Sequence, residues 1–318
     1  MNKINKFFED MKTRKVAFIG VGVSHTDLIK LFLKKGISVT VCDRKDAQSM
    51  GQVHDDLEAL GAQFCLGEKY LDSLTDFDVV FRAPGMYFNN EKLTEARKKG
   101  VVITSEMECF FDLCPCKTYA VTGSDGKTTT TTIIAGLLEK SGKKVYKGGN
   151  IGKALLPLIE EIDENDAAVV ELSSFQLISM RKSPDTAVIT NIAPNHLDVH
   201  GTMEEYTDSK KNLIAHQNAF AKTVLNLDNQ PTNNLEDMVR GKLVKFSRKA
   251  VPQCGAFLSE SGMLCYNNYG EVTEIIHMDR IRIPGIHNVE NYLAAIAAVW
   301  GEVSVDVIKD MAENFGGV

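Results

Sequence analysis

The stretch that decides the fold is Tyr119-Ala120-Val121-Thr122-Gly123-Ser124-Asp125-Gly126-Lys127-Thr128-Thr129. An apolar run typical of a buried strand leads into a glycine turn, and the residues that follow favour a helix. Backbone N–H groups in such a turn can surround phosphate oxygens at the helix start. The lysine supplies a cation for the β- and γ-phosphates, and the following hydroxyl suits Mg²⁺. The stretch therefore predicts a phosphate-binding loop, in the shortened form G-x-x-G-K-T because Val121 stands where the longer motif has glycine.

Strand-like and helix-like segments alternate on both sides of this loop. Strands are expected at residues 15–20 and 37–43, and helices at residues 26–35 and 289–300. Such alternation predicts parallel sheets with helices on both faces. The pattern weakens at residues 243–276, where short strands indicate a small β-rich excursion. The predicted fold class is α/β, with an N-terminal Rossmann-like parallel-sheet domain and a central domain of the P-loop ATPase type.

The segment Cys114-Pro115-Cys116-Lys117 interrupts the pattern just before a new strand. We place the domain boundary there, which gives a first domain at residues 1–114 and a central domain at residues 115–310. The seven cysteines are an odd number and are scattered along the chain. A chain of this length does not need disulfides, so reduced thiols are expected.

Composition excludes several classes of protein. Of the 318 residues, 44% are hydrophobic and 25% are charged, which is typical of a globular protein and not of a disordered one. The net charge of −6 argues against bulk nucleic-acid binding, which favours a basic excess. No stretch approaches the ~20 apolar residues that span a bilayer, and the N-terminus has no apolar core of signal-peptide length. We therefore expect no membrane insertion and a cytoplasmic location.

A second glycine turn, Gly20-Val21-Gly22-Val23-Ser24-His25, follows the first predicted strand and begins a helix. Asp43 ends the next strand, where a ribose-binding acid belongs in a dinucleotide fold. His25 occupies the position of the third glycine of G-x-G-x-x-G, and we expect its bulk to obstruct close packing of helix and strand. The turn predicts a nucleotide-bearing ligand, and a glycine turn shaped only by sterics is the alternative.

Polar residues follow two further strands of the central domain. Glu171 ends one strand and His196 follows another, so both are expected at the carboxyl edge of the sheet. There Glu171 can hold a cation, and His196 is a candidate metal ligand or acid–base group, although a single histidine is more often structural. Asn288 could cap a helix, whereas Asn291 lies one turn further and has no capping role.

Together these segments resemble the Mur ligases, the ATP-dependent amide-forming enzymes of bacterial cell-wall synthesis. The matching sequences are Thr-Gly-Ser-Asp-Gly-Lys-Thr-Thr, Gly-Gly-Asn-Ile-Gly at 148–152, Glu-Leu-Ser-Ser-Phe-Gln-Leu at 171–177, Asn-His-Leu-Asp-Val-His at 195–200, Tyr-Thr-Asp-Ser-Lys at 206–210 and Gly-Ile-His-Asn-Val-Glu-Asn at 285–291. They occur in family order, and the resemblance extends from residue 15 to the C-terminus. The sequence at 171–177 resembles the D-glutamate-adding members specifically.

The resemblance implies a reaction and its cofactors. ATP would phosphorylate the carboxylate of UDP-N-acetylmuramoyl-L-alanine, and the amine of D-glutamate would attack the resulting acyl phosphate. Two Mg²⁺ sites would be formed by Thr128, Glu171, His196 and Lys210, and the catalytic residues would be Lys127, His196 and Lys210. Lys210 matches the lysine that the family carbamylates, with Lys211 directly beside it. Asn195 replaces an acidic residue that many relatives carry before the histidine.

The resemblance also implies the binding residues. Those for ATP are Gly123, Ser124, Asp125, Gly126, Lys127, Thr128 and Thr129, with Asn288 and Asn291 at the adenine. Those for the UDP substrate are Val23, Ser24, Asp43, Gly85, Asn150 and Ser173.

Family members carry a third domain, so residues 311–318 are expected to begin a linker to it. We accordingly expect a monomer that binds the UDP substrate and ligates poorly. Three alternatives remain at this stage. They are another Mur or folylpolyglutamate-type ligase, a nicotinamide oxidoreductase built on the N-terminal turn, and a non-catalytic nucleotide-binding scaffold.

Overall fold

The computed structural model describes residues 2–22, 24–195 and 202–318. The chain forms two compact units, one of Met1–Cys114 with Lys153–Ile162 and the other of Pro115–Gly152 with Asp163–Val318. Residues 153–162, which we expected in the central domain, thus belong to the first unit. Residues 311 and 312, expected in a linker, are buried in helix α13 (Val305–Asn314) of the second unit.

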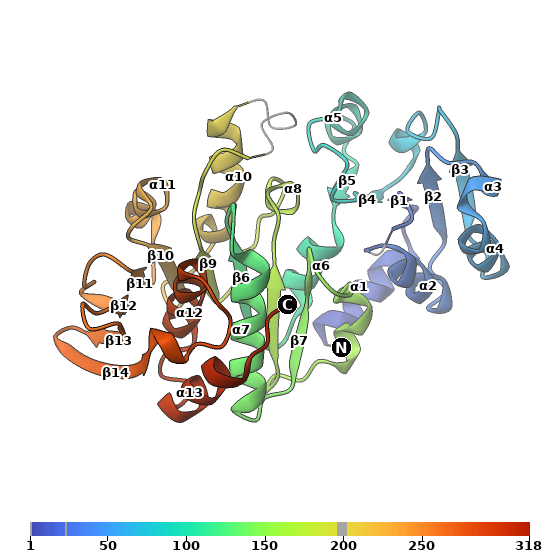
Figure 1. Cartoon of the computed structure of the whole chain (residues 1–318). Helices are drawn as coiled ribbons and strands as arrows, with labels where there is room; N and C mark the ends of the chain where they lie inside the picture. The colour runs from blue at the N-terminus through green and yellow to red at the C-terminus, as the bar shows by residue number, and fades with distance from the viewer. Residues whose placement is uncertain (1, 23, 196–201) are drawn as a thin grey trace. The chain divides into compact units, whose positions relative to one another are not determined.

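A parallel sheet forms the centre of the first unit (Figure 1). Within the described residues it has five strands in the order β3-β2-β1-β4-β5, and every neighbouring pair is parallel. The strands are β1 (Val16–Ile19), β2 (Val39–Asp43), β3 (Gln63–Leu66), β4 (Val79–Phe81) and β5 (Val102–Thr104). Strands β1 and β2 lie where the sequence predicted strands, whereas the edge strand β3 is exposed or half-buried and lacks the apolar run that marks β1.

A helix or a 3₁₀ turn lies in each connection between consecutive strands of this sheet, and further helices precede and follow the sheet along the chain. The helices of the first unit are α1 (Lys3–Lys12), α2 (Thr26–Lys34), α3 (Ala47–Met50), α4 (Gln52–Ala59), α5 (Glu91–Lys98) and α6 (Glu106–Leu113), with the 3₁₀ turns η1 (Leu74–Asp76) and η2 (Leu156–Glu161). Helix α2 buries Leu28, Ile29 and Phe32 on one face, the stripe that the apolar spacing predicts.

The second unit contains a larger, mixed sheet. In the part of the chain that is described, nine strands follow the order β14-β13-β12-β11-β10-β9-β6-β8-β7, and only β12–β13 and β13–β14 pair antiparallel. The strands are β6 (Lys117–Thr122), β7 (Val145–Gly149), β8 (Ala167–Glu171), β9 (Thr186–Ile189), β10 (Lys222–Asn226), β11 (Lys242–Ser247), β12 (Cys254–Leu258), β13 (Met263–Asn268) and β14 (Glu271–His277). The expected β-rich excursion is therefore a continuation of the central sheet, and the predicted α/β class is confirmed.

The described helices of the second unit are α7 (Lys127–Lys140), α8 (Ser174–Leu177), α10 (Met203–Ala215), α11 (Gln230–Asn233), α12 (Ile286–Val299) and α13, with the 3₁₀ turns η3 (Glu236–Met238) and η4 (Met278–Arg280). Two of them, α7 and α12, fix the position of the phosphate loop. Helix α12 is buried on all sides over residues 291–299, where alanines alternate with larger apolar residues. It packs against α7 in one hydrophobic cluster. Close packing of this kind holds the start of α12 beside the start of α7.

A buried carboxyl group attaches residues 153–162 to the rest of the first unit. Glu106 Oε1 accepts hydrogen bonds from the backbone N–H groups of Leu155 at 2.9 Å and Leu156 at 2.7 Å. Burial raises the pKa of Glu106 from 4.5 to about 7, against the opposing effect of the two hydrogen bonds. No residue pattern predicts this contact, because its partners are backbone groups about fifty residues away.

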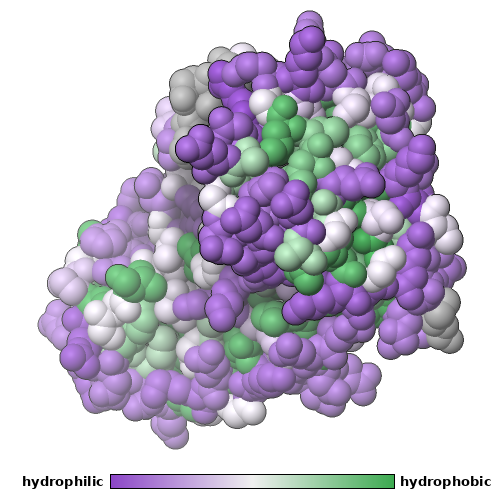
Figure 2. All heavy atoms as spheres, turned by 90° about the vertical axis from the view of Figure 1, so that its right-hand side faces the viewer, coloured by the Kyte–Doolittle hydropathy of each residue, from purple (hydrophilic) through white to green (hydrophobic). Residues whose placement is uncertain are grey.

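Large apolar side chains are exposed at some positions among the described residues. On the face shown in Figure 2, hydrophilic residues cover most of the area and hydrophobic residues form smaller patches between them. Exposed apolar side chains such as Phe220 and Tyr269 are ordinary when they occur singly. Over the described residues, no helix combines the length and apolar character needed to cross a membrane.

We predict that Glu106→Gln removes a pH-dependent loss of stability. The folded state holds the Glu106 proton up to about pH 7, whereas the unfolded chain releases it near 4.5, so stability falls as pH rises through this window. Glutamine keeps the Oε1 acceptor and cannot ionise. The free energy of unfolding of the variant minus that of the wild type, measured by urea unfolding, should therefore increase by about 2–3 kcal/mol between pH 5 and pH 8. Glu95→Gln, at an exposed ion pair, is the control, and an equal response of both variants would refute the assignment.

Candidate functional site

The predicted phosphate loop joins β6 to α7. Strand β6 ends at Thr122 and helix α7 begins at Lys127. Gly126 precedes the helix with φ +77°, and Gly123 has φ +154°. A Cβ at Gly123 would lie 1.9 Å from Thr190 Oγ1, so the backbone approaches β9 more closely than any side chain allows. The first N–H groups of α7 have no partner within the helix and are available to a ligand.

Two residues that follow β9 hold the loop in shape. Asn191 Oδ1 accepts a hydrogen bond from the Asp125 N–H at 3.0 Å, and the Asn191 carbonyl accepts one from the Ser124 N–H at 2.9 Å. Thr190 Oγ1 donates to the Asp125 carbonyl at 2.6 Å. Sequence reasoning assigned no role to Thr190 or Asn191, although their place at a strand end was a usable signal.

Two ammonium groups meet at one carbonyl oxygen of this loop. Lys127 Nζ donates to the Gly123 carbonyl at 3.1 Å and to that of Ser124 at 2.8 Å. Lys210 Nζ, from α10, donates to the same Gly123 carbonyl at 2.9 Å. Burial, and then the charge of Lys127, lower the pKa of Lys210 from 10.5 to about 7. Positive charge is thus concentrated where the loop would receive phosphate.

The neighbouring lysine has a different environment. Lys210 is 1% exposed and lies over the ring of Tyr206, at 4.6 Å from its centroid. The Tyr206 hydroxyl lies 3.1 Å from Ser124 Oγ in the loop. Lys211 is partly exposed and forms an ion pair with Asp208 at 2.6 Å. Of the two lysines, only Lys210 contacts the loop among the interactions of the described residues.

Three expected residues from different elements meet at one carboxylate. Glu171, at the end of β8, is 1% exposed. Its Oε2 accepts from Thr128 Oγ1 at 2.6 Å and its Oε1 from Asn150 Nδ2 at 2.8 Å. Both donors are neutral, and no cationic side chain pairs with Glu171 among the residues described. A buried carboxylate beside a hydroxyl, without a protein cation, fits the oxygen donor set of a divalent metal ion.

The two asparagines of α12 connect this helix to the loop. Asn291 Oδ1 accepts from Thr130 Oγ1 at 3.2 Å, and Asn291 Nδ2 donates to Asn288 Oδ1 at 3.0 Å. Helix α12 begins at Ile286, so Asn288 is not its cap, and its Nδ2 donates to the Pro284 carbonyl at 2.6 Å.

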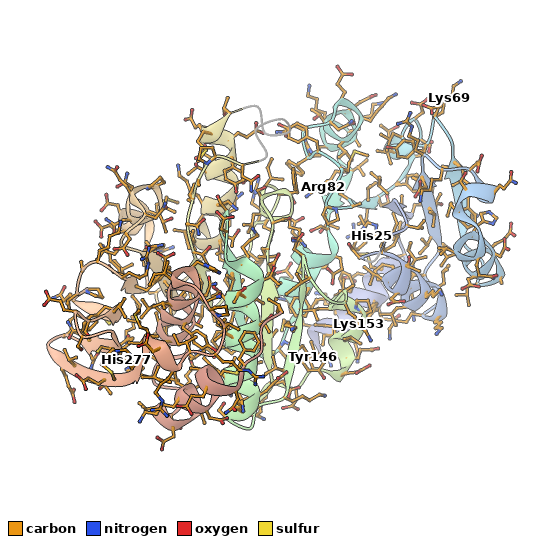
Figure 3. All side chains as sticks on the ribbon, in the orientation of Figure 1. His25, Lys69, Arg82, Tyr146, Lys153 and His277 are labelled. Atoms are coloured by element: carbon orange, nitrogen blue, oxygen red, sulfur yellow. The ribbon has the colours of Figure 1, made fainter. Side chains whose placement is uncertain are left out.

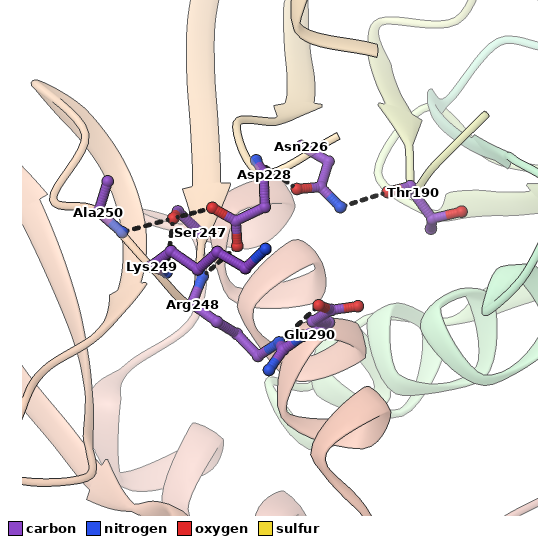
Figure 4. A network of polar contacts seen from close by, with 8 residues as sticks. All are labelled: Thr190, Asn226, Asp228, Ser247, Arg248, Lys249, Ala250 and Glu290. Atoms are coloured by element: carbon purple, nitrogen blue, oxygen red, sulfur yellow. Dashed lines mark hydrogen bonds and ion pairs between the residues drawn. The ribbon is translucent and has the colours of Figure 1, made fainter. Parts of the chain in front are cut away.

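A polar network connects α12 to the ends of three neighbouring strands (Figure 4). Arg248 Nε and Glu290 Oε1 of α12 are 2.5 Å apart. Asp228 accepts from the Arg248 N–H at 2.7 Å and from Ser247 Oγ at 2.5 Å. Asn226 Nδ2 donates to the Thr190 carbonyl at 2.8 Å, which joins β10 to β9 beside the loop. The network holds α12 in register with the carboxyl edge of the sheet.

Other expected residues of the second unit have different positions or fall outside the description. Ser173 caps α8, where its hydroxyl accepts from the Gln176 N–H at 3.3 Å. His196 lies outside the described residues, and so does any metal site that includes it. Within those residues, no group of three or more His, Cys, Asp or Glu side chains is placed to hold a metal.

The expected residues of the first unit lie at the carboxyl edge of its own sheet. Asp43 ends β2, and its carboxylate accepts from the Val21 N–H at 3.1 Å and the Lys45 N–H at 2.9 Å. Ser24 belongs to the same turn, whereas Val23 lies outside the described residues. Gly85 lies in the loop after β4, where Arg82 Nη1 donates to the carbonyls of the flanking Pro84 and Met86.

The ring of His25, whose bulk we expected to obstruct close packing of helix and strand, is buried against strand β1. The ring is 1% exposed and packs edge-on against Phe18, with centroids 5.2 Å apart. His25 Nδ1 lies 3.0 Å from the Gly20 carbonyl. The imidazole of His25 thus occupies space between the helix and the strand, where the glycine of the motif would have no side chain.

Comparison with protein families gives two matches that together cover most of the chain. Residues 121–299 match the family described as Mur ligase middle domain. Residues 14–105 match the one described as Mur ligase MurD-like, N-terminal domain.

Comparison with curated proteins gives relatives named UDP-N-acetylmuramoylalanine–D-glutamate ligase. The one from Acetivibrio thermocellus is 47% identical over 99% of this chain and 68% of its own length. The one from Clostridium perfringens is 46% identical over 99% of this chain and 68% of its own length.

Solved structures share the fold. A UDP-N-acetylmuramate:L-alanyl-γ-D-glutamyl-meso-diaminopimelate ligase from Neisseria meningitides has TM-score 0.63 and 21% identity, covering 96% of this chain and 99% of that chain. A UDP-N-acetylmuramate–alanine ligase from Thermotoga maritima has TM-score 0.55 and 22% identity, covering 96% of this chain and 69% of that chain. At these identities the similarity concerns the fold alone.

We predict that Gly126→Ala is more destabilising than Gly142→Ala. Both glycines flank α7 in the left-handed region, at φ +77° and φ +92°, so both variants incur about 1–2 kcal/mol of backbone strain. A Cβ at Gly142 meets open space, whereas one at Gly126 would lie 2.4 Å from Asn291 Oδ1. Displacing Asn291 breaks its bond to Thr130 and should add about 1 kcal/mol or more in urea unfolding. Equal losses would contradict the close packing of α12 on the loop.

Proposed function

Because the chain belongs to the Mur ligase family, as one of its D-glutamate-adding type, we propose that it joins D-glutamate to UDP-N-acetylmuramoyl-L-alanine at the expense of ATP. The family predicted from the sequence motifs is confirmed, and the oxidoreductase hypothesis is wrong. We place the reaction in the cytoplasm, where ATP is available. The observation that carries the proposal is the meeting of Lys127 and Lys210 at the Gly123 carbonyl, beside the Thr128–Glu171 pair.

The loop provides for the transfer of phosphate between two anions. A substrate carboxylate oxygen would attack the γ-phosphorus of ATP, and the bond from that phosphorus to the β–γ bridging oxygen would break, releasing ADP. The ammonium group of Lys127 and the first N–H groups of α7 would offset the negative charge that accumulates. Asn191 and Thr190 already hold the loop in place, so little reorganisation is needed. The bound Mg²⁺, held by Thr128 and Glu171, would supply additional charge neutralisation.

The acyl phosphate then makes the carboxyl carbon electrophilic. The amine of D-glutamate would attack this carbon, and the tetrahedral intermediate would collapse to the amide as inorganic phosphate leaves. Asn150 contacts Glu171 and lies beside Gly149, where a Cβ would come within 2.2 Å of the Glu171 carbonyl. This close approach supports the proposed role of Asn150 at the reacting end of the substrate.

Lys210 is proposed to carry a carbamate. The neutral amine attacks the carbon of CO₂, an N–C bond forms and a proton leaves to solvent. A pKa of about 7 makes a large share of this amine neutral near physiological pH. The product has two oxygens that could serve as metal ligands, which the ammonium cannot.

The UDP moiety is proposed to bind the first unit at the turn that contains Ser24. The Asp43 carboxylate and the Arg82 guanidinium hold the flanking backbone segments, including the loop with Gly85. Asp43 is therefore proposed to act partly through the turn and not only on the ribose.

The substrate assignment is tested by calorimetric titration of UDP-N-acetylmuramoyl-L-alanine into the chain, with UDP-N-acetylmuramic acid as the comparison. We expect the alanyl compound to bind more tightly, and Lys127→Ala to leave this affinity unchanged while ATP binding falls at least tenfold. Failure of both UDP compounds to bind would overturn the substrate assignment.

The carbamate is tested by ¹³C NMR of the protein in ¹³C-bicarbonate between pH 7 and pH 8. We expect a carbamate signal in the wild type and in Lys211→Met, because exposed Lys211 is paired with Asp208. The signal should be absent from Lys210→Met. A signal that disappears with Lys211 and not with Lys210 would reverse the assignment.

A further inference from the structure

His25 combines burial with incomplete hydrogen bonding. Its ring is 1% exposed, and Nε2 has no hydrogen-bond partner among the described residues. Burial is the main cause that lowers the pKa of His25 to about 4, so the ring is neutral at physiological pH. Because the Gly20 carbonyl can only accept, Nδ1 carries the proton and donates to it, and Nε2 remains an unused acceptor.

Packing alone does not explain an imidazole at this position. A phenylalanine ring has a similar shape, could keep the edge-on contact with Phe18 and would bury no unpaired nitrogen. What the imidazole provides beyond packing is the bond from Nδ1 to the Gly20 carbonyl at 3.0 Å.

The hydrogen bond from His25 Nδ1 restrains the glycine turn from its buried side. The His25 N–H donates to the Gly22 carbonyl at 3.0 Å, so backbone and side chain of one residue hold the turn at two points. On its other side the turn is held by Asp43, through the Val21 N–H, and by the Cys42 carbonyl, which accepts from the Gly20 N–H at 2.8 Å. His25 directly precedes α2 in the first unit (Figure 3), and its side chain is buried.

We propose that His25 is a positioning residue that holds the Gly20–Gly22 backbone in the conformation that receives a uridine diphosphate group. It takes the place of the third glycine and supplies a side-chain bond that glycine lacks. The part concerning the uridine nucleotide rests on the proposed function, whereas the effect on the turn does not. The proposal implies that restoring the glycine of the motif would weaken the site.

The test compares His25→Phe with His25→Asn, whose side-chain amide can donate in place of Nδ1. Stability is measured by urea unfolding, and hydrogen exchange is measured on the peptide covering residues 19–27. We expect His25→Phe to be at least as stable as the wild type and yet to exchange the turn amides about tenfold faster. His25→Asn should be less stable and exchange the turn at nearly the wild-type rate. His54→Phe is the matched control in the same unit, since His54 also stacks on a phenylalanine, Phe64.

UDP, which serves as the probe for the nucleotide, is then titrated into each variant. The affinity should fall about tenfold in His25→Phe and be largely restored in His25→Asn. If the turn amides of His25→Phe exchange as slowly as those of the wild type and its UDP affinity is unchanged, the proposal is overturned. A wild type that fails to bind UDP, with the exchange pattern as expected, would overturn the proposed function and leave the turn-positioning role supported. If His25→Phe does not fold, His25→Leu replaces it in the same comparison with His25→Asn.

Discussion

The second unit depends on one carbonyl oxygen, that of Gly123, which accepts from two lysine ammonium groups at once. Two cations at 3.1 and 2.9 Å from one atom repel each other, and the groups that contact them among the described residues are backbone carbonyls, the Thr122 hydroxyl and the Tyr206 ring, none of which carries a full negative charge. Such an arrangement is favourable when a multiply charged anion binds beside it. The same repulsion, added to burial, brings the pKa of Lys210 toward neutrality. One local constraint thus favours both phosphate binding and lysine chemistry.

The loop that carries this carbonyl is closely packed on two sides. Gly123 lies against Thr190, which follows β9, and Gly126 lies against Asn291 of α12, so a side chain at either glycine would collide with these residues. Helix α12 is in turn held by its buried alanine-rich face against α7 and by the Arg248–Glu290 pair at the sheet edge. Packing far from the phosphate loop therefore sets the distances within it.

The residues that sequence analysis located were those whose place follows from the ends of parallel strands. Thr128 and Glu171 were predicted to share a cation, and the structure brings their side chains to 2.6 Å. Lys210 came from the family resemblance alone, because on its own helix it appears only as one charge among several. Glu106 and Arg82 could not be found, since their partners are backbone carbonyls and amides that no residue pattern encodes. The bond from His25 to the Gly20 carbonyl was not predicted, because the rule for the third glycine describes the available volume and does not address hydrogen bonding.

The two units stabilise their glycine turns by different means, and the difference follows from their surroundings. In the second unit, polar side chains from the next strand bind the loop from outside, which leaves its cationic groups on the ligand side. In the first unit, a neutral imidazole binds the turn from the core, and a carboxylate binds it from the end of β2. A charged group in this place would need several hydrogen bonds to offset its desolvation, as the buried guanidinium of Arg82 has with three backbone carbonyls. The neutral imidazole supports the turn with a single side-chain hydrogen bond.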